Sequence, residues 1–89
     1  MEEISINVSG CITALQFLDR VGKAFGTPLG NFSALNQYLL HNYYPKIIFV
    51  GMGEFWERCP HAMKEIEMIL ERVKSQYQKE GKEFEYELL

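Results

Sequence analysis

Few side chains in this sequence combine the residue type and the spacing that catalysis or metal binding requires. The two histidines, His41 and His61, each lack a second histidine at metal-ligand spacing. The one aspartate, Asp19, falls in an amphipathic segment beside Arg20 and Lys23, where a solvated surface role is expected. We therefore expect no metal, no cofactor and no enzymatic activity.

One glycine-containing loop offers an alternative. Gly51-Met52-Gly53 follows an apolar run and precedes a helical pattern, as a dinucleotide-binding loop does. Trp56 stands where the third glycine of that motif would fall, which weakens the match. A small enzyme or nucleotide binder using this loop is kept as one of three hypotheses.

The segment 31–44 stands out because it contains no Asp, Glu, Lys or Arg, although these residues make up 24% of the chain. Protein interfaces are depleted of Lys and Glu at their centre and enriched in tyrosine. Simple burial of the segment is the competing explanation. With Phe32, Leu35 and Leu39 turned inward, the outward residues would be Ser33, Asn36, Gln37, Leu40, His41 and Tyr44.

Three segments have strand patterns. Residues 3–8 and 83–88 alternate polar and apolar side chains, and the apolar run 47–50 predicts a strand buried on both sides. The glutamates at 83, 85 and 87 require water, so helices should cover mainly one face of the sheet.

Helical periodicity fills the intervals between these strands. Thr13 should cap a helix ending at Gly26, and Asn31 or Ser33 should cap a second one reaching about residue 42. A short turn at 54–58 and a long helix from Pro60 to Gly81 should follow. The inward residues would be Leu15, Leu18, Val21 and Phe25 in the first helix, and Met63, Ile66, Ile69, Leu70, Val73 and Tyr77 in the last.

Strands separated by helices imply parallel crossover connections. We therefore predict one α/β domain over 1–89, with two layers and a three-stranded parallel sheet whose middle strand is 47–50.

Charge and composition narrow the partners and the compartment. The net charge of −3, with basic residues spread singly, disfavours nucleic acid. No apolar run approaches a membrane span, and the acidic start lacks the pattern of a secretory signal, so we expect a cytoplasmic protein without membrane contact. In that compartment Cys11 and Cys59 should be free thiols.

Several short motifs resemble the barstar family of ribonuclease inhibitors. The stretch 30–35, Gly-Asn-Phe-Ser-Ala-Leu, is similar to the family's Gly-x-Asn-Leu-Asp-Ala-Leu, and it follows Gly26-Thr27-Pro28. Tyr44-Pro45 before an aliphatic strand, Phe55, and Glu80-Gly81 before the alternating last strand also match. The likeness extends over nearly the whole chain in length and element order, and it implies a barstar-like fold.

The resemblance also implies a function. In that family the loop and helix that start near Asn31 cover the cationic active site of a ribonuclease. Carboxylates on the inhibitor take the place of the RNA phosphates there. Here those acidic positions fall on Ser33, Gln37 and Gln76, all neutral. The partner-binding residues implied by the outward face and the family together are Gly30, Asn31, Ser33, Asn36, Gln37, Leu40, His41, Tyr44 and Gln76.

Three hypotheses follow. The first is a barstar-like inhibitor or immunity protein, monomeric when free, whose protein partner is a small ribonuclease or another toxin. The second is a non-inhibitory adaptor or subunit on the same scaffold. The third is the nucleotide binder described above.

Overall fold

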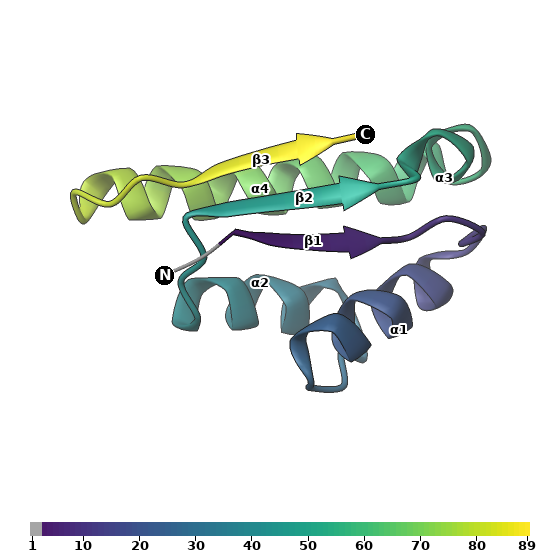
Figure 1. The fold of residues 1–89 in the computed structure, drawn as a ribbon, viewed down its shortest axis with the longest axis horizontal. Helices are drawn as coiled ribbons and strands as arrows, with labels where there is room; N and C mark the ends of the chain where they lie inside the picture. Colours follow the sequence, from purple (N-terminus) through teal and green to yellow (C-terminus); the bar gives the residue numbers. More distant parts are fainter. Residues whose placement is uncertain (1–2) are drawn as a thin grey trace.

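A computed structural model of the chain describes residues 3–89 and has a two-layer α/β fold (Figure 1). The elements are β1 Ile4–Asn7, α1 Ala14–Phe25, α2 Phe32–His41, β2 Lys46–Val50, α3 Met52–Arg58, α4 Pro60–Lys79 and β3 Glu85–Leu88. Their order and type confirm the predicted fold class. Within residues 3–89, no helix is both long enough and apolar enough to cross a membrane.

The sheet is parallel throughout, in the order β1-β2-β3, so the apolar strand is central as predicted. Ile6 of β1 lies opposite Phe49 of β2, which in turn lies opposite Leu88 of β3. Figure 1 shows the three arrows pointing the same way, with α4 drawn behind β2 and β3 in this view.

The helices cover one face of the sheet. Ile6, Ile47 and Phe49 on that face are buried, at 0–1% exposure. On the opposite face Ser5 is exposed and its neighbour Ile48 is half-buried. The prediction that β2 is buried on both sides was therefore wrong for the second face, because no helix packs there.

Helix α1 has the predicted ends but a different inward side. The Thr13 hydroxyl accepts a hydrogen bond from the Gln16 amide at 3.1 Å, and Gly26 ends the helix in the left-handed region. Leu15, expected inside, is 72% exposed, whereas Phe17 is fully buried. The reason is aromatic packing: the Phe17 ring stacks on that of Phe55, with centroids 5.1 Å apart.

The remaining elements follow the sequence closely. Helix α3 starts two residues before the predicted turn, and α4 starts at Pro60 as predicted. Strand β3 begins at Glu85, two residues later than the predicted 83–88, and Phe84 just before it is buried in the core. The six apolar side chains predicted for the inner face of the last helix are all buried: Met63, Ile66, Ile69, Leu70, Val73 and Tyr77.

Both cysteines are free thiols, as predicted. Cys11 is buried, and this burial raises the pKa of its thiol. The Cys59 thiol donates to the main-chain oxygen of Ile12 at 3.0 Å, linking the start of α4 to the segment before α1.

Candidate functional site

The uncharged helix α2 is anchored at its N-terminal end by Asn31. The backbone of Asn31 is extended, and its side-chain oxygen accepts a hydrogen bond from the Ala34 amide at 2.8 Å. Leu35 and Leu39 are buried at 1% exposure, and Phe32 packs against the core while remaining partly exposed. This inward side matches the predicted one.

Side chains bond several carbonyl oxygens near the end of α2, where the last four have no regular partner within the helix. The Asn42 side chain donates to the Tyr38 carbonyl at 2.9 Å. His41 Nδ1 lies 2.8 Å from the Gln37 carbonyl and donates to it when that nitrogen carries the proton. The Tyr77 hydroxyl of α4 donates to the Leu39 carbonyl. These bonds fix the end of α2 against α4.

The structure places five of the predicted residues on one exposed surface. Ser33, Gln37 and His41 recur every four residues along α2 and are exposed, and Gly30 and Asn31 are exposed just before the helix. We call Ser33, Gln37 and His41 the exposed row. No side chain in this row carries a formal charge at neutral pH when His41 is neutral.

Two further predicted residues, Asn36 and Leu40, are half-buried instead of outward-facing. Asn36 helps to line a pocket of about 220 Å³ between α2 and α4, together with Phe32, Ser33, Glu65, Ile69 and Arg72. We call this the interhelical pocket. Asn36 and Leu40 are partly covered instead of facing solvent, because α2 packs along α4.

Gln76 belongs to the same side of α4. It lies one helical turn beyond Arg72, which lines the interhelical pocket. It is exposed, and its side-chain nitrogen donates to Glu80 at 3.1 Å. The exposed Gln76 side chain can therefore contact a molecule that binds to α2.

Tyr44 does not join this surface. The chain leaves the helix at Asn42, and Tyr44 packs in an aromatic cluster with Phe25, at 5.3 Å between centroids, and with Tyr38. The hydroxyls of Tyr38 and Tyr44 lie 3.0 Å apart. Burial, as the larger cause, and the hydrogen bond to Tyr44 together raise the pKa of Tyr38 to about 12. The predicted outward position of Tyr44 was wrong, because helical spacing does not apply beyond residue 41.

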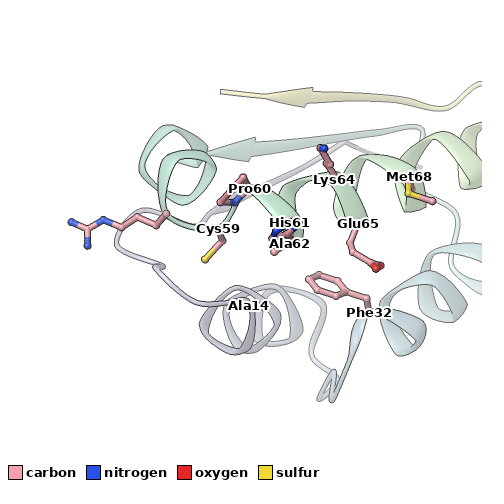
Figure 2. Close-up of a pocket in the computed structure, with 10 residues that line it drawn as sticks. Ala14, Phe32, Cys59, Pro60, His61, Ala62, Lys64, Glu65 and Met68 are labelled. Atoms are coloured by element: carbon pink, nitrogen blue, oxygen red, sulfur yellow. The ribbon is translucent and has the colours of Figure 1, made fainter.

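An apolar pocket that sequence reasoning missed adjoins the start of α2. It measures about 660 Å³ and lies where α1, α2 and α4 meet (Figure 2). Figure 2 shows the Phe32 ring directed at α4, with Glu65 extending toward it and the Cys59 thiol pointing toward α1. Met68, which lines this pocket, is 60% exposed. A methionine outside the inward-facing positions of the predicted last helix was the sequence signal that could have indicated an apolar surface here.

In the loop considered for nucleotide binding, two backbone amides already form hydrogen bonds within the chain. Gly51 has φ +87°, and the amides of Gly51 and Met52 donate to the Leu89 main-chain oxygen at 3.1 and 2.7 Å. A phosphate on this loop would have to displace those bonds. Among residues 3–89, no group of three or more His, Cys, Asp or Glu side chains is arranged to hold a metal ion.

Comparison of the chain with protein-family models, with curated proteins and with solved structures finds no match.

Proposed function

We propose that this domain acts by binding another protein through α2 and the adjoining side of α4, and not by catalysis. The observation that carries the proposal is the exposed row itself. Ser33, Gln37 and His41 face solvent from a helix without any acidic side chain, Lys or Arg, in a chain where one residue in four is charged. A neutral polar helix surface can be desolvated by a partner at less cost than a charged one.

The resemblance to the barstar family gives the class of partner: a small ribonuclease or related toxin. Two features support this choice. The helix capped by Asn31 starts where the family's binding helix starts. Gln76 lies on the side of α4 that flanks this helix, as the acidic position of the family does. The proposal places the protein in the cytoplasm as a free monomer that covers the active site of its target.

The neutral residues at the three acidic positions change the expected binding mode. Carboxylates facing a cationic site accelerate association and set specificity. Ser33, Gln37 and Gln76 can form hydrogen bonds but provide no such attraction. We therefore expect slower, less salt-dependent association than a carboxylate-bearing inhibitor would have, and rejection of targets that require ion pairs.

The same loss of carboxylates favours the second candidate, an adaptor or subunit that binds through this surface without inhibiting RNA cleavage. The two candidates predict different outcomes in one assay.

That assay is a titration of a barnase-type ribonuclease with the purified domain, following RNA cleavage at low ionic strength. Inhibition that reaches completion at equal amounts of the two proteins is expected. Gln37→Ala should weaken it, whereas Gln78→Ala, at another exposed glutamine outside the proposed surface, should not. Full RNA cleavage in the presence of folded domain would exclude inhibition of this enzyme class and leave the adaptor.

A further inference from the structure

The two cysteines of this chain are far apart in the sequence but lie on segments that contact each other. The Cys59 thiol donates to the main-chain oxygen of Ile12 at 3.0 Å, and Ile12 is bonded directly to Cys11. Cys11 belongs to the buried core, and Cys59 packs against that core. Both are free thiols. The fold therefore brings together the two side chains of the sequence that could form a disulfide bond.

Both cysteines lie at positions where the backbone is not part of a regular element. Cys11 lies in the stretch between β1 and α1, and Cys59 is the single residue between α3 and α4. Figure 2 shows the Cys59 thiol pointing toward α1. A disulfide requires Cα atoms about 4.4–6.8 Å apart. Because Cys59 already contacts the residue after Cys11, we expect a local shift of the stretch before α1 to meet this requirement without unfolding.

The two thiols differ in how easily a reagent from solution can reach them. Cys59 is half-buried and lines the apolar pocket, which is open to solvent. Cys11 is 2% exposed, and burial raises the pKa of its thiol. Reactive cysteines are accessible ones, often placed beside a second cysteine that completes the reaction. Cys59 is therefore the thiol that reacts first, and Cys11 the one that reacts with it.

We propose that Cys11 and Cys59 form an oxidation-responsive pair, which closes to an intramolecular disulfide by exchange with a small disulfide such as oxidised glutathione. The Cys59 thiolate attacks one sulfur of the oxidised glutathione, which forms a mixed disulfide and releases one reduced glutathione. The Cys11 thiol then loses its proton, and its sulfur attacks the Cys59 sulfur. The second glutathione leaves and takes up a proton. Two protein thiols are oxidised, and one glutathione disulfide is reduced to two thiols.

Closing the pair would change the contacts around the start of α4. The bond from Cys59 to the Ile12 oxygen would be lost, and a covalent link would replace it between the stretch before α1 and the junction of α3 with α4. The Cys59 sulfur would also turn away from the apolar pocket that it lines. The inference is independent of the proposed function, because neither cysteine belongs to the exposed row.

The test equilibrates the purified domain with mixtures of reduced and oxidised glutathione and measures each species by intact mass after acid quenching. The intramolecular disulfide weighs two hydrogens less than the dithiol, and its share gives the effective concentration of one thiol at the other. We expect this effective concentration to be at least about tenfold higher in native buffer than in urea, because the fold holds the two segments together. No such excess, or mixed disulfides and linked dimers in place of the intramolecular bond, would overturn the inference.

Cys11→Ala and Cys59→Ala are matched variants, each checked for folding by circular dichroism. Cys11→Ala should accumulate the mixed disulfide with glutathione at Cys59, whereas Cys59→Ala should stay reduced because Cys11 is buried. Glutathione bound to Cys11 in Cys59→Ala would contradict the proposed order of reaction. The comparison of the native and unfolded parent needs neither variant, so a variant that fails to fold leaves the test intact. Failure of this test would not alter the ribonuclease titration, and failure of that titration would not alter this one.

Discussion

The Tyr77 hydroxyl on α4 donates a hydrogen bond to the main-chain carbonyl of Leu39 on α2, across thirty-eight positions of sequence. Both residues are buried, and the Leu39 oxygen belongs to the last helical turn, where intrahelical donors are lacking. Burial raises the pKa of Tyr77, so the hydroxyl remains a donor well into the alkaline range. This bond therefore holds the end of the proposed binding helix in place.

Removing that hydroxyl should destabilise the fold. Tyr77→Phe keeps the ring and leaves the Leu39 carbonyl buried without a donor, which costs about 1–3 kcal/mol. Urea denaturation monitored by circular dichroism measures the change in the free energy of unfolding. Tyr86→Phe is the control, since its hydroxyl bonds the exposed Glu71 carboxylate, which water can solvate instead. Equal losses in both variants would contradict the special role of Tyr77.

Two glycines two positions apart should respond in opposite ways to alanine. Gly51 has φ +87°, and an added Cβ would lie 2.1 Å from the Ser9 hydroxyl oxygen, so Gly51→Ala should destabilise the domain strongly. Gly53 lies in α3 with nothing near its missing Cβ, so Gly53→Ala should stabilise the domain by roughly 0.5–1 kcal/mol. Thermal melts of the two variants compare them directly, and a shift in the same direction would contradict this placement of Gly51.

The inward side of α1 is a feature that the sequence pattern predicted only in part. Periodicity correctly gave the ends of the helix, the buried Leu18 and Val21 and the half-buried Phe25, but it placed Leu15 inside and omitted Phe17. Leu15 lies three residues before Leu18 and Phe17 lies four residues before Val21, so helical spacing permits either on the inward side. The choice depends on Phe49 and Phe55, which are distant in sequence and pack on the Phe17 ring.

The candidate site was predictable to a similar extent. Composition identified 31–44, and capping rules identified Asn31, because both signals are local. The half-burial of Asn36 and the displacement of Tyr44 depend on α4 and on Phe25, which local patterns do not include. The apolar pocket combines residues of all four helices, so no single segment of the sequence indicates it.

Alkaline pH should weaken the fold through Tyr38. Its pKa is about 12 in the folded state against an ordinary value of 10.0, so the folded state keeps a proton that the unfolded chain loses. This contribution to stability is complete below pH 10 and is lost as the pH rises toward about 12. Tyr38→Phe should show a shallower loss in urea denaturation across that range. If the free energy of unfolding falls with pH equally in Tyr38→Phe and in the parent, the pKa of Tyr38 is not raised.

Restoring a carboxylate to the exposed row should strengthen ribonuclease binding. Ser33→Asp places a negative charge in the first turn of α2, which has no acidic residue, and should stabilise the helix by about 0.3–1 kcal/mol. It should also speed association with a basic ribonuclease and make inhibition more sensitive to salt. Inhibition constants at low and high ionic strength provide the measurement. Gln78→Asp adds the same charge away from the surface, and an equal gain there would indicate general attraction only.

The most direct test of protein binding through α2 is amide NMR of the isotope-labelled domain during titration with an unlabelled, catalytically inactivated barnase-type ribonuclease. We predict shift changes concentrated at residues 30–41 and around Arg72 and Gln76, with the open sheet face around Ser5 and Glu87 unaffected. Changes confined to that sheet face, or no changes with a ribonuclease shown to be folded, would contradict the assignment of α2 as its binding surface.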